Sequence, residues 1–245
     1  MQNLKKLLTT ARTTEADTVS SGIITEFEKN DWSWDAHLTG IFGLLKSENI
    51  QLSKAIKRMK AESDLEEKDE QRDNKVRAIN YIVIGFIHHS DSAISSAAEK
   101  VNTVFEHYGI DIIYESYASE TSLIKSLLTD FAVPDIQTAI TALPGLSQMV
   151  VDLRTAQTAF EAAQLLFQNE KAAEGSEENA TELKKKVISV INDKLVVYLN
   201  AMIQVNEAKY GAFSGTVAQI INDMNEIVKK RRKVKDTANI EFTQS

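Results

Sequence analysis

The stretch LSQMVVDLRTAQTAFEAAQLLF, residues 146–167, decides the fold of this chain. Its apolar residues recur at alternating spacings of three and four, which places them on one seam of an α-helix. The seam comprises Leu146, Met149, Leu153, Ala156, Phe160, Ala163 and Phe167. The same pattern recurs in Ile188, Ile191, Leu195, Tyr198, Met202 and Val205, and in Phe213, Val217, Ile220, Met224 and Ile227. The sequence therefore predicts an all-α protein built from long antiparallel amphipathic helices.

Glycine, proline and polar clusters divide the rest of the chain into further predicted helices. Before residue 110 the predicted helices cover 14–29, 35–61, a third around Val76, Ile79, Val83 and Phe86, and 90–108. The acidic segment 62–70 is expected to separate the second from the third. After an irregular stretch at 110–117, the predicted helices are a short one from Ser119 to Phe131, a piece opened by Pro134, and then 146–173, 178–210 and 212–232.

The order of these helices suggests an internal duplication. Residues Lys75, Val76, Ile79, Asn80 and Val83 are echoed by Lys186, Val187, Ile191, Asn192 and Leu195 at an offset of 111 or 112. This predicts two tandem four-helix bundles, residues 1–112 and 113–233, followed by a disordered polar tail at 234–245. One continuous eight-helix bundle is the alternative.

Several segments resemble a bacterial family of helical proteins described only as a domain of unknown function. They are RDNKVRAINYIVIGF (72–86), AAEKV (97–101), YGIDIIYESYASET (108–121), LSQMVVDL (146–153), AFEAAQLLF (159–167) and VYLNAMIQVN (197–206). The resemblance implies an all-helical bacterial protein. It carries over no catalytic or binding residue.

Composition limits the partners and the compartment. The formal net charge of -7 provides no overall attraction to nucleic acid or to anionic lipid. The basic run Lys229, Lys230, Arg231, Arg232, Lys233 and Lys235 contains no aromatic residue for base stacking, so it is expected to complement a helix end and the acidic tip around 170–178. The apolar run 79–87 is too short to span a bilayer, and the first residues lack a signal-peptide core. With no cysteine, these features predict a cytoplasmic protein that binds no nucleic acid and spans no membrane.

The sequence contains no motif of a known catalytic, cofactor or metal site. None of the histidines at 37, 88, 89 and 107 stands in a Glu-x-x-His or His-Glu-x-x-His pattern. Glycine-rich phosphate loops and the Gly-x-Ser-x-Gly elbow are also missing. We therefore predict no catalytic residue, no metal ligand and no cofactor. Asn49 and Arg154 lie on or beside seams, where polar groups commonly set helix register.

These observations favour a non-enzymatic scaffold or protein-interaction module with an unidentified protein partner, and they leave homo-oligomerisation open. The candidate interaction residues are Trp32 and Trp34, which flank a turn, and Tyr114 and Tyr117, which follow the fourth helix.

Two alternatives belong to other functional classes. The first is a ligand-binding or enzymatic bundle with a pocket between the halves, near the two tyrosines and residues 134–145. The second is a membrane-active helical protein that would use residues 79–87.

Overall fold

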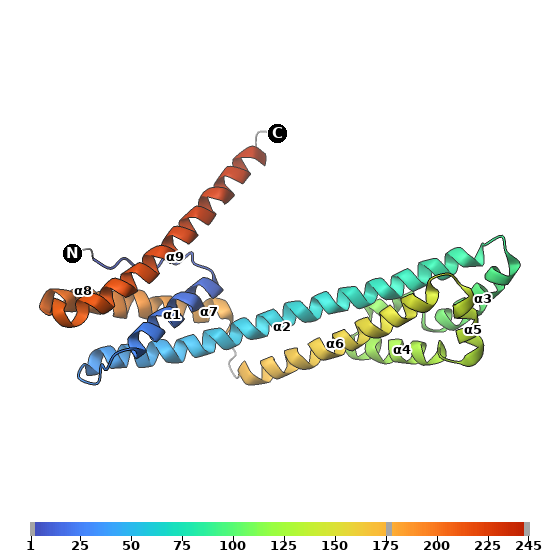
Figure 1. Cartoon of the computed structure of the whole chain (residues 1–245), viewed down its shortest axis with the longest axis horizontal. Coiled ribbons are helices and arrows are strands. Elements are labelled where there is room, and N and C mark those ends of the chain that lie inside the picture. Colours follow the sequence, from blue (N-terminus) through green and yellow to red (C-terminus); the bar gives the residue numbers. More distant parts are fainter. Residues whose placement is uncertain (1–2, 175–177, 243–245) are drawn as a thin grey trace. The chain divides into compact units, whose positions relative to one another are not determined.

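The computed structural model describes residues 3–174 and 178–242, with side chains described for residues 3–173 and 178–233. Its helices are α1 (Thr13–Glu28), α2 (Ala36–Ile87), α3 (Ser92–Tyr108), α4 (Tyr117–Asp130), α5 (Pro134–Ala142), α6 (Leu146–Glu174), α7 (Ala180–Ser189), α8 (Val196–Val205) and α9 (Glu207–Phe242) (Figure 1). A 3₁₀ turn, η1 (Ile110–Tyr114), follows α3, and a π-helical segment, η2 (Val190–Leu195), joins α7 to α8. Within the described ranges there is no strand, which confirms the all-α class.

The chain forms two compact units. Unit 1 contains residues 1–59 and 171–245, and unit 2 contains residues 60–170. Unit 2 is therefore inserted into the sequence of unit 1. Helix α2 contributes its first part to unit 1 and its remainder to unit 2.

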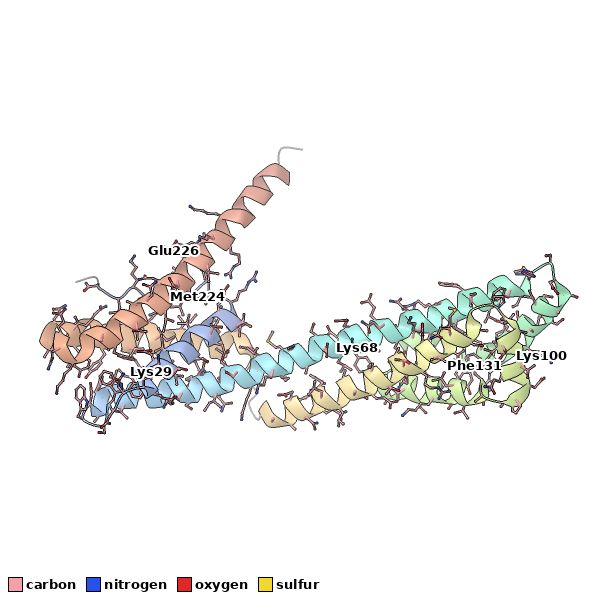
Figure 2. The ribbon with its side chains drawn as sticks, in the orientation of Figure 1. Lys29, Lys68, Lys100, Phe131, Met224 and Glu226 are labelled. Carbon is pink, nitrogen blue, oxygen red and sulfur yellow. The ribbon has the colours of Figure 1, made fainter. Side chains whose placement is uncertain are left out.

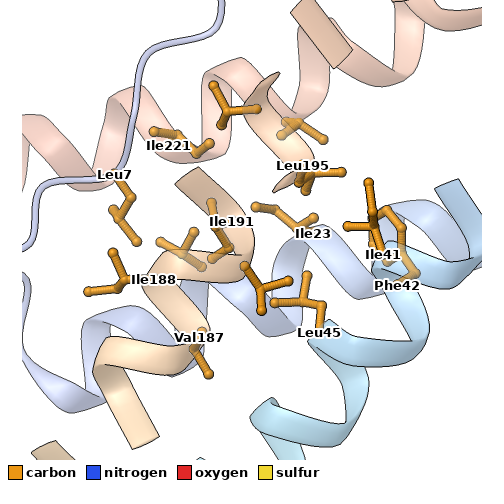
Figure 3. Packing of buried hydrophobic residues seen from close by; sticks show 14 of the residues in the cluster. Leu7, Ile23, Ile41, Phe42, Leu45, Val187, Ile188, Ile191, Leu195 and Ile221 are labelled. Carbon is orange, nitrogen blue, oxygen red and sulfur yellow. The ribbon is translucent and has the colours of Figure 1, made fainter. Parts of the chain in front are cut away.

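Unit 1 is built around one large apolar cluster. α1 packs against α7 and α9, and α8 packs against α9. The cluster includes Ile23 of α1, Phe42 and Leu45 of α2, and Ile191 of η2, all at most 1% exposed. Leu7 enters it from a non-helical segment that precedes α1 (Figure 3).

Unit 2 has its own core. The cluster draws Val76 and Ile79 from α2, Phe105 from α3, Ile124 from α4 and Leu153 from α6. Phe131, at the end of α4, is buried in the same cluster, whereas Lys100 of α3 is exposed (Figure 2). A smaller cluster of Leu65, Phe160 and Ala163 lies along α2 and α6.

Local sequence signals explain where most helices begin and end. Gly109 takes a positive φ of 73° directly after α3, the position at which glycine was predicted to end that helix. Pro134 occupies the first turn of α5, also as predicted. Asp91 caps α3 and Ser116 caps α4, in place of the predicted Ser90 and Ser119.

The predicted helix break at the acidic segment 62–70 is wrong, because α2 is a single helix of 52 residues that runs through this segment. Opposite charges and amides spaced three or four residues apart support it there: Asp69 pairs with Arg72, Asp73 with Arg77, and Gln71 with Glu67. The two units consequently meet in sequence at 59/60 and 170/171 rather than at the predicted 112/113. The internal duplication stays a prediction.

The end of the chain also differs from expectation. α9 continues to Phe242, whereas a disordered tail was predicted from residue 234. Residues 243–245 lie outside the described residues. From residue 217 onward the buried positions of α9, among residues with described side chains, are Val217, Ile221, Asn225 and Val228, and the predicted seam residue Ile227 is 54% exposed. The predicted seam repeats every 3.5 residues, whereas a straight α-helix has 3.6 residues per turn. Successive seam residues therefore rotate gradually away from the core.

Candidate functional site

An open groove of about 530 Å³ lies on unit 1 between α2 and α8. It is lined by Ala36, His37, Gly40, Ile41, Leu44, Asp193, Lys194, Val197, Tyr198 and Ala201. Leu44 and Val197 stand on opposite helices and are 48% and 55% exposed. A Cβ placed on Gly40 would meet nothing within 4 Å, so the space above this glycine is open. We call this feature the α2–α8 groove.

A hydrogen-bonded network holds one end of this groove. Asp35 Oδ2 accepts hydrogen bonds from the hydroxyls of Tyr198 (2.8 Å) and Tyr210 (2.6 Å), while Oδ1 accepts from the N–H of Leu38 (2.9 Å). Burial alone would raise the pKa of Asp35, but these donors outweigh it and the pKa lies below the ordinary value. Asp35 is thus an ionised anchor that ties the start of α2 to α8 and α9.

The candidate residues Trp32 and Trp34 lie beside this network. Trp32 is buried among aromatic rings, with its ring centroid 5.0 Å from that of Phe213. Trp34 is 49% exposed, and the Lys209 ammonium lies 4.4 Å from its ring centroid. Both line a hollow of about 270 Å³ next to Lys209 and Phe213. Trp32 is therefore a core residue, and Trp34 is the member of the pair that presents surface.

The candidates Tyr114 and Tyr117 belong to unit 2 and do not share a pocket with residues 134–145. The depression at α5 is lined by Pro134, Gln137, Thr138, Thr141 and Ala142. Tyr114 is 78% exposed, and Tyr117 packs edge-on against Phe160 with a centroid distance of 5.2 Å. Neither tyrosine lines the depression at α5, and their role in an interaction stays a prediction.

The most unusual chemistry in unit 2 is a buried charge cluster around Arg72 of α2. The Arg72 side chain is fully buried, and its guanidinium carbon lies 3.7 Å from the centroid of the Phe160 ring. It donates to Glu120 of α4, to Asp69 of α2 at 2.6 Å, and to Gln157 Oε1 of α6 at 3.3 Å. One guanidinium thus links three helices of unit 2.

The carboxyls of this cluster are not all satisfied. Glu120 Oε1 and Asp73 Oδ1 are buried and lack a hydrogen-bond partner while both groups are ionised. Burial, followed by the neighbouring Asp73 and Asp69, outweighs the attraction of Arg72 and raises the pKa of Glu120 to about 8. A proton on Glu120 allows it to donate to Asp73.

Asp69, Asp73 and Glu120 each direct an oxygen to a common point, and these oxygens lie within 4.8 Å of one another. Oxygen ligands of this kind suit Mg²⁺ or Ca²⁺. However, Arg72 already bonds to two of the three carboxyls, and its positive charge opposes a second cation in the same space. The arrangement fits a shared proton better than a metal ion.

The remaining predicted features have structural positions. Asn49 is buried and bonded to Ser20 and Ser21, which agrees with its predicted register role. Arg154 is exposed, so that role fails for it. His88 and His89 follow the end of α2 and are exposed.

The basic run does not lie in the last turn of its helix, because α9 continues beyond it. Arg231 pairs with Glu15 at the start of α1, in place of the predicted acidic tip. The side chain of Lys235 lies outside the described residues.

Sequence reasoning missed Arg72, Glu120 and the Asp35 network. Arg72 stands in a segment that reads as a solvated charged face, and its burial depends on where α4 and α6 pack. A usable signal was present, since Phe160 lies on the predicted seam of α6 and an arginine opposite an aromatic seam can stack there.

Among the residues that the structure describes, length and composition allow one stretch, Ala180–Val205, to cross a membrane. The evidence for this is weak, because 44% of that window is buried inside unit 1 and its residues contribute to the core.

Comparison with known proteins gives one informative result. No curated protein and no solved structure matches the chain. Residues 62–225, about two thirds of the sequence, match a family of unknown function, DUF6261, and the chain therefore belongs to that family.

Proposed function

We propose that this protein is a non-enzymatic interaction module that docks an amphipathic helix of a partner protein in the α2–α8 groove. The open space above Gly40, between the exposed Leu44 and Val197, carries the proposal. Two neighbouring helices with apolar side chains on both walls form a cradle for the apolar face of a third.

The small residues of the groove support this choice of partner. Ala36, Gly40 and Ala201 leave the helix backbones accessible, so a partner helix can approach closely and place its larger side chains between Leu44 and Val197. Lys194 and the half-buried Tyr198 border the apolar strip and offer polar contacts at its edge. Apolar anchors with a polar rim are typical of protein interfaces.

The polar groups of the groove argue against catalysis there. Asp35, the buried carboxylate beside it, already accepts bonds from two tyrosines and a backbone N–H. Asp193 pairs with Lys6 at 2.8 Å and its pKa lies below the ordinary value, first because of that bond. These groups are committed to structure. A cytoplasmic location is part of this proposal and is supported by the absence of cysteine.

Two glycines of α2 offer a matched test. Gly40 lines the groove and Gly43 does not, yet a Cβ on either would meet nothing within 4 Å. Leucine at either position should stabilise the helix by about 1 kcal/mol, since glycine is a poor helix former. Only Gly40→Leu should fill the groove.

The measurement is site-specific photo-cross-linking from position 197 in native cells. We expect a cross-linked partner with the parent protein and with Gly43→Leu, and its loss with Gly40→Leu. The cross-linked peptide should map to an amphipathic helix, and a second copy of this chain is one identity it could have. Cross-linking that is unchanged by Gly40→Leu would refute the groove as the docking site.

A further inference from the structure

The segment Asn3–Leu8, before α1, is not helical, and side chains rather than a neighbouring strand bind its backbone. Asn200 accepts from the N–H of Leu4 at 2.8 Å and donates to its carbonyl at 3.1 Å. Asn192 does the same for Leu7, at 2.7 and 2.9 Å. Asn225 accepts from the N–H of Leu8 at 2.9 Å and donates to the carbonyl of Lys6 at 2.9 Å. We call this site the asparagine groove.

Three asparagine amides recognise the segment by its main chain. A side-chain amide presents one donor and one acceptor, as the backbone of an adjacent strand would, so each asparagine pairs with the segment whatever its side chains are. The preference for a particular sequence comes from the side chains of Leu4 and Leu7, which are only 5% and 1% exposed. Lys5 and Lys6 face solvent. The groove therefore selects an extended chain with leucines three positions apart.

The π-helical segment brings two of these amides to the groove. Asn192 lies within η2 and Asn200 lies eight positions later in α8. Over eight residues a regular α-helix would rotate the second side chain about 80° from the first. The wider π turn reduces that rotation. Such π segments occur frequently at functional sites.

The groove continues beyond Leu4 as a cavity of about 270 Å³. It is lined by Leu4, Ile203, Glu207, Gly211, Ser214, Gly215, Ala218, Gln219 and Asn222. Ser214 is 1% exposed and its hydroxyl lacks a hydrogen-bond partner within the described residues. A buried hydroxyl of this kind offers a bond to a chain that runs further along the groove. The segment Asn3–Leu8 forms no hydrogen bond with the Ser214 hydroxyl.

The family match separates the groove from its occupant. The matching residues 62–225 include Asn192, Asn200 and Asn225 and exclude the segment Asn3–Leu8. The clamp thus belongs to the matched region, and the segment lies outside that region together with α1.

We propose that the asparagine groove is a binding site for an extended peptide segment of a partner protein, with leucines at positions i and i+3. The chain's own residues 3–8 occupy it in the structure. Because residues 3–8 are covalently attached to the protein, they compete with a partner peptide at an effective concentration of about millimolar order. A partner segment offsets this advantage by also filling the cavity and bonding Ser214. This site is separate from the α2–α8 groove and takes an extended ligand rather than a helix.

The test makes the tethered occupant exchangeable while the full chain stays folded around it. A protease recognition sequence is inserted between the exposed Thr9 and Thr10, and the folded protein is cut. A fluorescein-labelled peptide of residues 1–9 is then added, and anisotropy reports its binding. We expect saturable binding to the cut protein and none to the uncut protein.

Matched variants check the recognition rule. An unlabelled Lys5→Ala peptide should compete as well as the parent peptide, whereas Leu7→Asp should compete at least about tenfold less well, because it loses a buried leucine. In the cut protein, Asn200→Ala should weaken peptide binding about tenfold or more, and Asn74→Ala on α2, an exposed residue of unit 2, should leave it unchanged. If the cut protein unfolds, or never exchanges its segment, residues 3–8 belong to the core and the proposal is overturned.

Discussion

The two units bury polar groups in different ways. Unit 1 buries the carboxylate Asp35, and it also buries neutral amides, Asn192 and Asn225, whose partners are the backbone of a separate, non-helical segment. Unit 2 buries a full charge, Arg72, whose partners are side chains of its own helices. In unit 1 these amides bind a segment that is distant in sequence. In unit 2 the polar groups fix the positions of helices relative to one another.

Their energies differ accordingly. An amide paired with backbone is neutral, so its loss leaves unpaired groups worth about 1–3 kcal/mol. A buried ion pair is weak evidence for net stability, but removing one partner leaves an uncompensated charge. Unit 2 should therefore show the larger single-site effects and the stronger dependence on pH.

The largest effect is expected at Arg72. Arg72→Ala removes the cation shared by the buried Glu120 and the half-buried Asp69 and should lower the free energy of unfolding by about 3–5 kcal/mol. Urea denaturation followed by circular dichroism measures this. Arg154→Ala in α6 is the control; because Arg154 is exposed, its effect should stay within about 0.5 kcal/mol. Equal midpoints for the two variants would show that the cluster does not hold unit 2 together.

The second-largest effect on stability is expected in the apolar core of unit 2, where no charged group is removed. Leu153 is fully buried in the middle of the α6 seam, so Leu153→Ala should cost about 2–5 kcal/mol through the cavity it leaves. Val151→Ala on the same helix, where Val151 is 52% exposed, should change the urea midpoint little. If Val151→Ala cost more than Leu153→Ala, the seam of α6 would be assigned to the wrong face.

The seams could be predicted because the apolar period alone determines them. Ala16, Val19, Ile23 and Phe27 of α1, spaced three or four residues apart in the predicted helix 14–29, are all buried. The acidic composition of residues 62–70 wrongly predicts a helix break, because side-chain pairs spaced three or four residues apart support the continuous helix α2. Ile227 was misplaced by a heptad spacing that a straight helix does not keep.

The candidate sites were less predictable for a different reason. A lone asparagine such as Asn192 beside Ile191 and Leu195 indicates a buried polar group, but only the path of residues 3–8 shows what it binds. The π turn at η2 has no apolar period of its own. The sequence predicts Trp32 and Trp34 together as interaction candidates, yet only the structure separates the buried ring from the exposed one.

The pH dependence of stability should also separate the units. The pKa of Glu120 is raised from the ordinary 4.5 to about 8, so between these values the folded state binds a proton that the unfolded state has released. The free energy of unfolding should therefore fall as pH rises from about 4.5 to about 8. Asp69, whose pKa burial also raises, adds to the same trend.

Glu120→Gln isolates this contribution, since its amide can donate to Asp73 at every pH while its carbonyl accepts from Arg72. The variant should match the parent near pH 4.5 and exceed its stability above pH 8. The titratable and charged groups that interact with Glu120 are Arg72, Asp69, Asp73 and Tyr117. Parallel stability curves for variant and parent would place the raised pKa elsewhere.

The smallest effect is expected at the basic run of α9, beside the connection between the asparagine groove and α1. Since α9 continues past this run, its cations do not lie at a helix terminus and gain little from the helix dipole. Arg231 differs from its exposed neighbours Lys229, Lys230 and Arg232, because it pairs with Glu15 and donates to the carbonyl of Thr10 at 3.1 Å. Replacing all four by glutamine should therefore lower stability by about 1 kcal/mol, and Arg231→Gln alone should account for most of that loss. The loss should shrink as salt is raised, because screening weakens a partly exposed pair.

A filter-binding titration with DNA and RNA tests the alternative, that the basic run binds nucleic acid. The net charge of -7 and the lack of stacking aromatics predict only weak binding by the parent protein. Submicromolar affinity at physiological salt, lost in the four-glutamine variant, would instead assign these cations to a nucleic-acid site.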